Sequence, residues 1–140
     1  MKIQSIRLVP YLRFQGNCEE ALGFYASILD GKFTIEQKYD VPEMNAPEDY
    51  RDKILHASFE FGENRFYACD IFPGAVIKES GKNVSLSLLL ETQQEGDKVF
   101  DRLSEGGKVN FPFKKQFWGD WHGSFIDRFG IEWNVNAQDG

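Results

Sequence analysis

The sequence predicts an α+β fold of two βαβββ modules, because it carries an internal repeat, two capped helical segments and several alternating strand patterns. His56-Ala-Ser-Phe59 recurs as His122-Gly-Ser-Phe125, and each tetrad opens an alternating segment that meets a polar turn and leads into a second segment. A duplicated unit places corresponding side chains around a pseudo-two-fold axis, so the repeat indicates where a site could lie. We expect one domain over residues 1–140, with modules over residues 1–74 and 82–140.

Two segments have the period of amphipathic helices. The first follows Asn17 and the second follows Thr92, each with a glutamate three residues later, which is the capping-box pattern. Both apolar stripes stop at glycine followed by lysine, a typical helix end. The sequence therefore predicts helices over Cys18–Asp30 and Gln93–Glu105.

Four further segments alternate between apolar and polar residues, as half-buried strands do. They cover residues 7–14, 55–61, 84–91 and 131–136. Each has one apolar face suited to packing under a helix and one mixed, polar face. If the sheet curls, the polar face becomes the inside of a cup.

The hairpin turns predict which side chains meet across this polar face. A first turn centred on Glu63 sets His56 opposite Asp70, and directly opposed residues have Cβ atoms about 4.5–5.5 Å apart. The same arithmetic in the second hairpin sets His122 opposite Asn134. An error of one residue in either turn would break its pair.

Composition and charge exclude several classes of partner. The chain has a formal net charge of −6 and no basic run, which argues against nucleic-acid binding. No stretch approaches the ~20 apolar residues of a membrane span, and residues 1–5 do not resemble the start of a signal peptide. We expect a cytoplasmic protein in which Cys18 and Cys69 are free thiols.

Three segments lack a regular pattern. Residues 40–53 predict an excursion over the surface, with a lid as one interpretation, and residues 73–82 link the two halves. Residues 111–122 are aromatic and include Trp118 and Trp121. This last segment fits a ligand wall, a dimer contact, or a loop folded back on the core.

Several motifs carry a family resemblance over almost the whole chain. They are Tyr11-Leu-Arg-Phe-Gln-Gly-Asn-Cys-Glu-Glu-Ala-Leu-Gly-Phe-Tyr25, the Leu55-His-Ala run, Asn83-Val-Ser-Leu-Ser-Leu, Phe117-Trp-Gly-Asp with Gly123, and Asp127-Arg-Phe-Gly-Ile-Glu-Trp133. The chain resembles the PhnB-like, or demethylubiquinone methyltransferase-like, family of the vicinal oxygen chelate superfamily, which includes glyoxalase I, fosfomycin-resistance proteins and extradiol dioxygenases. The resemblance implies an eight-stranded cup-shaped sheet (the glyoxalase/bleomycin resistance fold) and a homodimer.

The resemblance also implies four metal-ligand positions, on the first and last strands of each module. They fall on Val9, Asp70, Ser85 and Asn134 of this chain. Only Asp70 is a good ligand for a divalent metal, and Val9 has no donor atom. We therefore expect no standard metal site and no cofactor.

Other side chains of the polar face remain candidates for chemistry. His56 and Asp70 form the best pair for general acid–base work, because a neighbouring carboxylate raises the pKa of an imidazole and orients its ring. The alternatives for His56 are a structural hydrogen bond and a shifted metal site made by Asp70 with Glu60 or His122. Residues predicted to contact a ligand are Tyr11, Arg13, Glu60, Trp118, Trp121, His122, Glu132 and Asn134.

Two functions follow from these candidates. The first is a small-molecule-binding protein with a polar, aromatic-walled cup. The second is an enzyme of the lyase or isomerase type that uses the His56–Asp70 pair. Arg13 would hold an anionic group of the ligand by bidentate hydrogen bonds, unless it forms a salt bridge with Glu132 or Asp70 instead.

Overall fold

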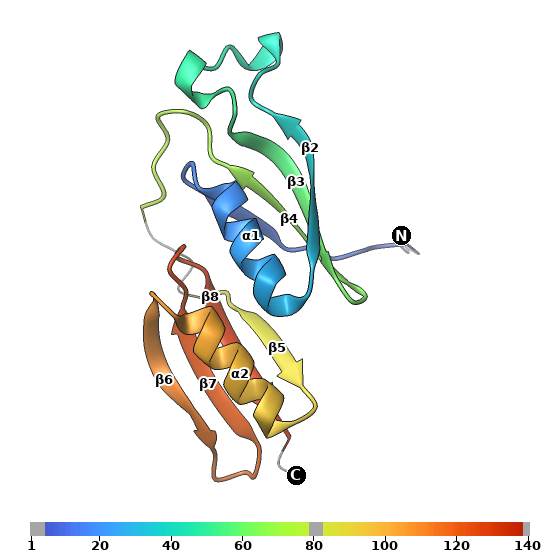
Figure 1. Cartoon of the computed structure of the whole chain (residues 1–140), viewed down its shortest axis with the longest axis vertical. Coiled ribbons are helices and arrows are strands. Elements are labelled where there is room, and N and C mark those ends of the chain that lie inside the picture. The colour runs from blue at the N-terminus through green and yellow to red at the C-terminus, as the bar shows by residue number, and fades with distance from the viewer. Residues whose placement is uncertain (1–4, 79–82, 139–140) are drawn as a thin grey trace, which may run out of the picture. The chain divides into compact units, whose positions relative to one another are not determined.

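The computed structural model describes residues 5–78 and 83–138, and its two compact units divide between Val76 and Ile77. The first unit contains β1 (Tyr11–Phe14), α1 (Cys18–Leu29), β2 (Lys32–Lys38), β3 (Ile54–Phe61) and β4 (Asn64–Asp70). The second contains β5 (Leu86–Leu90), α2 (Gln93–Ser104), β6 (Lys108–Lys115), β7 (Trp121–Ile126) and β8 (Glu132–Ala137). Figure 1 shows the helices and strands of both units.

Each unit holds one helix and one mixed four-stranded sheet, which confirms the predicted α+β fold of two modules. The strand orders are β1-β4-β3-β2 and β5-β8-β7-β6. In both sheets the first strand pairs in parallel with the last, and the remaining pairs are antiparallel. The joining of the two sheets into one cup, and of both units into one domain, stays a prediction.

The core of the first unit lies between α1 and one face of its sheet (Figure 1). Tyr25 of α1 is fully buried and meets Phe59 and Phe66 edge-on, with ring centroids 6.4 Å and 6.1 Å away. Phe59 and Phe66 are directly opposed across β3 and β4, and their rings stack at 4.7 Å. Aromatic burial on this face leaves the other face of the sheet for polar side chains.

The second unit repeats this arrangement with different side chains. Phe100 of α2 meets Phe125 of β7 edge-on, with centroids 5.1 Å apart. Leu103, Trp133 and Val135 complete the buried layer. In both units, therefore, the helix covers the face predicted to be apolar.

The helix boundaries agree with the sequence prediction to within one residue, but the two caps differ. Thr92 accepts a hydrogen bond from the Glu95 backbone N–H at 3.2 Å, as the capping-box pattern predicts. Asn17 makes no such bond with its side chain. At α1 the cap is supplied by Asp70, whose Oδ1 accepts the Cys18 N–H at 2.9 Å.

The excursion between β2 and β3 is anchored rather than loose. It contains two short 3-10 turns, Pro42–Met44 and Glu48–Tyr50. Tyr39, at its start, donates a hydrogen bond to the Asp70 carbonyl at 2.8 Å, and Tyr50 donates one to the Ile71 carbonyl. These bonds tie the segment to the end of β4, so they argue against the lid interpretation.

Two strand predictions differ from the structure. Residues 7–10 are not part of a strand, and Leu8 is 94% exposed, so the first strand is shorter than its alternating pattern indicates. Much of the segment 111–122 is regular, since β6 runs to Lys115 and β7 begins at Trp121. The two register shifts between β6 and β7 explain why alternation did not reveal the hairpin.

Within the described ranges, neither helix has the length and apolar character needed to cross a membrane.

Candidate functional site

The predicted contact between His56 and Asp70 is wrong, because the register of the first hairpin differs by one residue. Phe61 pairs with Asn64, so the connection has two residues instead of three. Gly62 makes this possible with a φ of 56°, a conformation that residues other than glycine rarely adopt. A shift of one residue moves a side chain to the opposite face of a sheet. Asp70 therefore shares the helix-covered face with Phe66 and Ala68, and His56 lies on the other face.

Asp70 has a structural role in this buried position. Its side chain is 1% exposed. Oδ1 accepts the backbone N–H groups of Gly16 and Cys18, and Oδ2 accepts that of Ile54, all at 2.9 Å. The carboxylate thus joins the start of α1, the start of β3 and the end of β4. It is not available as a partner for an imidazole or a metal ion.

His56 belongs instead to a group of three rings on the face of the first sheet opposite α1. Its Nδ1 forms a 2.9 Å hydrogen bond with the Tyr11 hydroxyl. The His56 and Tyr67 ring centroids are 5.0 Å apart, and Tyr11 lies 5.7 Å from His56 and 6.0 Å from Tyr67. We call Tyr11, His56 and Tyr67 the three-ring cluster.

A cation and a thiol adjoin this cluster. The Arg13 guanidinium carbon lies 5.1 Å from the centroid of the Tyr11 ring, within the range of a cation–π contact. Cys69 is the register partner of Arg13. Burial, together with the neighbouring Cys69, raises the pKa of the Tyr11 hydroxyl to about 12, so the phenol is neutral at physiological pH. A neutral phenol offers His56 either a donor or an acceptor.

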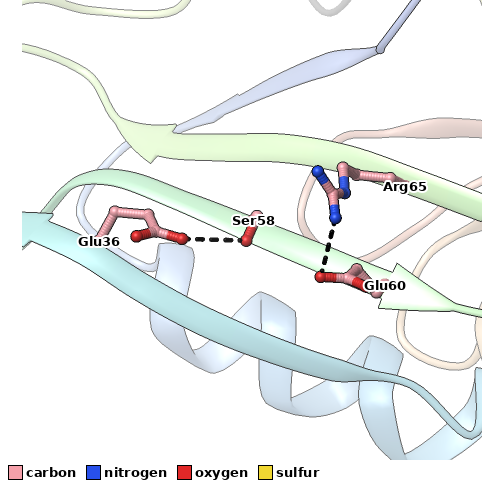
Figure 2. A network of polar contacts seen from close by, with 4 residues as sticks. All are labelled: Glu36, Ser58, Glu60 and Arg65. Atoms are coloured by element: carbon pink, nitrogen blue, oxygen red, sulfur yellow. Dashed lines mark hydrogen bonds and ion pairs between the residues drawn. The ribbon is translucent and has the colours of Figure 1, made fainter.

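The three-ring cluster continues into a row of polar side chains along β3. Figure 2 shows Ser58 next to Glu36 and, farther along the strand, Glu60 next to Arg65. Ser58 donates to Glu36 Oε1 at 3.4 Å, and Arg65 Nη2 lies 3.2 Å from Glu60 Oε1. Glu60 is therefore paired with a cation of its own hairpin, whereas Arg13 has no ion pair with any described residue.

The second sheet carries a polar face of a different kind. His122 Nδ1 bonds Asn136 Oδ1 at 2.8 Å, so its predicted pairing with Asn134 is wrong by two residues. The connection spans residues 127–131, and Asp127 holds it by accepting the N–H groups of Phe129 and Ile131. A shift of two residues keeps the predicted face. Asn134 donates instead to Ser85 Oγ at 2.6 Å.

The other residues of the second unit that were predicted to contact a ligand, Glu132, Trp121 and Trp118, do not lie together. Glu132 opens β8 opposite Ile126. Trp121 opens β7 and lies 5.6 Å from Phe113, centroid to centroid. Trp118 lies in the connection between β6 and β7 and is 57% exposed. Within this unit, Trp118 and Trp121 therefore do not form one wall over the polar strands.

The four ligand positions implied by the vicinal oxygen chelate resemblance do not fit a divalent metal. Val9 has no donor, the Asp70 oxygens are occupied by backbone N–H groups, and the Ser85 hydroxyl already accepts the Asn134 amide. The described residues also contain no group of three or more His, Cys, Asp or Glu side chains placed to hold a metal ion.

Two members of the site were missed from the sequence. Tyr67 and Cys69 share the face of His56 only once the turn has two residues. The signal was present in Gly62, because a glycine at the first position of a two-residue connection is typical of tight hairpins.

Comparisons with known proteins identify the fold and the family. Protein YjdN of Escherichia coli (strain K12) is 28% identical over 93% of this chain and 94% of its own length. Protein PA1353 from Pseudomonas aeruginosa is 37% identical, with a TM-score of 0.83 over 97% of this chain and all of the other. The fosfomycin resistance protein FosX from Mesorhizobium loti shares the fold at 10% identity, with a TM-score of 0.63 over 96% of this chain and 93% of its own.

The family assignment rests on a match that spans most of the chain. The family described as 3-demethylubiquinone-9 3-methyltransferase matches residues 6–136. Together with neighbours of the glyoxalase/bleomycin resistance/dioxygenase fold, this match agrees with the predicted resemblance. The chain belongs to the family described as 3-demethylubiquinone-9 3-methyltransferase.

Proposed function

We propose that this protein binds a small molecule on the polar face of the first sheet, at the three-ring cluster. The observation that carries the proposal is the contact of Tyr11, His56 and Tyr67 on the face that α1 leaves uncovered, with ring centroids 5.0–6.0 Å apart. Aromatic side chains with polar tips give a ligand both a flat apolar surface and hydrogen-bonding groups. A core role does not explain Tyr11, which is 39% exposed.

The lining is also arranged to hold its shape without a ligand. The Tyr11–His56 hydrogen bond joins β1 to β3, and Tyr67 lies between them on β4. A surface fixed in this way loses little conformational entropy when a ligand binds. Preorganised rings on strands are therefore better suited to binding than the exposed Trp118.

The experiment is a screen of small aromatic and carbonyl fragments against isotope-labelled protein, in which binding is detected by changes in the amide chemical shifts. We expect the bound fragments to perturb Tyr11, His56 and Tyr67. Tyr67→Ala should weaken these fragments, while Asn134→Ala, at the corresponding register position of the second sheet, should not. Fragments that gather on another surface and ignore Tyr67→Ala would refute the proposal.

A second candidate function is proton transfer by His56, with Tyr11 replacing the predicted Asp70 as its partner. The 2.9 Å hydrogen bond at Nδ1 fixes the ring, and Nε2 has no hydrogen bond to any described residue. An oriented imidazole with one free nitrogen suits a general acid or base. Deuterium exchange from D2O into carbons next to a carbonyl, in a panel of simple 2-oxo acids, tests this candidate. Exchange that His56→Gln leaves unchanged, or no exchange at all, would remove it.

Two further properties are proposed with this function. A homodimer is supported by the two edge strands of each four-stranded sheet, because unpaired edges favour association or need covering. A cytoplasmic location is supported by two free cysteines, which a reducing compartment maintains. Sedimentation of a monomer at micromolar concentration would contradict the first.

A further inference from the structure

We infer that the ligand of the three-ring cluster is a planar monocarboxylate, with its carboxylate held by Arg13 and its ring or conjugated body placed on Tyr11 and Tyr67. This inference rests on the proposed binding site and names the chemical class of its ligand.

The first step is the position of the guanidinium. Tyr11 and Arg13 are both exposed and alternate with the buried residues Leu12 and Phe14 on β1. Both side chains therefore lie on the face of the three-ring cluster. Arg13 contacts the Tyr11 ring through its guanidinium carbon at 5.1 Å, which fixes the cation beside the rings.

The second step is the unused binding capacity of that cation. The arginine fork carries five N–H donors and matches a carboxylate in a bidentate manner. Contact with a ring face leaves the N–H edges of the guanidinium free. Of the two acidic partners predicted for Arg13, Asp70 is occupied by three backbone N–H groups, and Arg13 forms no salt bridge with any described residue.

The third step is the charge of the ligand. Glu36 and Glu60 lie on the same face, where Arg65 is paired with Glu60 and Lys32 stands opposite Glu60 in the register of β2 and β3. At the cluster itself the available cation is the Arg13 guanidinium, which matches a single negative charge. A phosphate dianion would meet repulsion that one arginine does not offset.

The fourth step is the shape of the ligand. The ring centroids of Tyr11, His56 and Tyr67 form a triangle with sides of 5.0–6.0 Å. Offset or edge contacts between aromatic rings occur over the same range of distances. A single flat ring or enone fits over such a group, and the Tyr11 hydroxyl and His56 are within reach of a polar substituent.

The test uses benzoate as the probe, with benzamide as its neutral counterpart and phenyl phosphate as its dianionic one. We expect amide shifts to show that benzoate binds at the cluster more tightly than the other two. Arg13→Gln should lower the affinity for benzoate by about tenfold, the loss expected for one charge-assisted bidentate contact, and leave the affinity for benzamide unchanged. Arg65→Gln is the matched control, since it removes the same charge from the same sheet without touching the cluster.

Each alternative result has a separate meaning. Equal binding of benzoate and benzamide, with Arg13→Gln neutral, overturns the carboxylate inference and leaves the proposed binding site standing. Equal losses in Arg13→Gln and Arg65→Gln overturn direct recognition in favour of general charge attraction. Tighter binding of phenyl phosphate overturns the single-charge argument. If none of the three probes binds while other fragments occupy the cluster, the ligand class is wrong; if nothing occupies it, the site is wrong as well.

Discussion

The two units share one plan but differ in the chemistry of their polar faces. All five tyrosines of the chain fall before residue 77, and all three tryptophans fall after it. The register makes the difference specific: Tyr67 corresponds to Asn134, and Tyr11 corresponds to Ser87. The first face therefore has aromatic rings beside a cation, and the second has amides and hydroxyls.

The histidine that is repeated in both units has a different hydrogen-bond partner in each. His56 bonds a phenol, whereas His122 bonds the amide of Asn136. The helix-covered positions remain apolar in both units, with Phe59 and Phe125 fully buried. Packing thus constrains one face of each sheet, while the side chains of the other face differ between the units. This contrast is the reason to place the proposed site on the first unit.

The largest expected effect concerns the two buried carboxylates. Asp70 accepts N–H groups from Gly16, Cys18 and Ile54, which are separated from it by 54, 52 and 16 positions in the sequence. Asp127 accepts N–H groups from Phe129, Ile131 and Trp133, which are only two, four and six positions away. We expect Asp70→Ala to lower the free energy of unfolding by about 4 kcal/mol, since several buried donors lose a charged acceptor. Asp127→Ala should cost about 2 kcal/mol, because its turn is local.

Urea denaturation followed by far-UV circular dichroism measures both losses. Glu63→Ala, in the exposed turn between β3 and β4, is the control and should have little effect. A loss for Asp70→Ala no larger than that of Glu63→Ala would contradict the structural role of Asp70. It would also reopen the predicted catalytic role.

The next effect concerns the residue that differs between the repeated tetrads, Ala57 and Gly123. A Cβ at Gly123 would lie 2.6 Å from a ring carbon of Phe100 and 2.8 Å from the Phe113 Cα. Gly123→Ala should therefore destabilise the second unit by about 2 kcal/mol through overpacking. Ala57→Gly should cost about 1 kcal/mol through backbone entropy.

Tryptophan fluorescence during denaturation measures the Gly123→Ala loss, because the three tryptophans all belong to the second unit. A stabilised Gly123→Ala protein would show that α2 and β6 can move apart, and that the glycine is not required by packing.

The alternation and capping patterns predicted the fold because they are local. Each helix and most strands are specified by patterns of neighbouring residues in the sequence, and the order of these elements gives the two modules. The site depended on how many residues each hairpin turn uses. One extra residue assigned to the turn at Gly62 moved Asp70 to the wrong face, and the two-residue error at Asp127 did no such damage because strands alternate with a period of two.

Long-range polar contacts could not be predicted in the same way. The cap of α1 comes from β4, 52 residues later in the sequence, so the local pattern at Asn17 was misleading. Tyr11 and His56 are 45 residues apart, and only the strand order β1-β4-β3 brings them together. Arg13 was predicted to contact a ligand because of its chemistry, but its place beside Tyr11 required the structure.

A pH effect distinguishes the units because the ionising tyrosines lie in only one of them. Burial raises the pKa of Tyr11 and of Tyr50 to about 12, above the ordinary value of 10. The folded state therefore holds these protons more tightly than the unfolded state. Their contribution to stability is complete below pH 10 and is lost as the pH rises towards 12.

Absorbance of tyrosinate during alkaline titration should show these late midpoints, and stability should fall between pH 10 and 12. Tyr11→Phe and Tyr50→Phe should each reduce that fall. Stability that stays constant across this range would contradict the raised pKa values.

The smallest effect concerns the helix caps, where the two units again differ. Thr92 caps α2 with its own hydroxyl, which accepts the Glu95 N–H and donates to the Glu95 carboxylate at 3.0 Å. Thr92→Ala should therefore cost about 1 kcal/mol, and Thr92→Ser should restore most of it. Asn17 occupies the same position before α1 but makes no capping bond, because Asp70 accepts the Cys18 N–H in its place.

Asn17→Ala should change the free energy of unfolding by only about 0.3 kcal/mol, well below the usual loss for a cap. Urea denaturation followed by helix ellipticity compares the three variants under one condition. An Asn17→Ala loss equal to that of Thr92→Ala would mean that α1 relies on its local cap, and that the carboxylate of Asp70 is less committed to the helix than its three hydrogen bonds indicate.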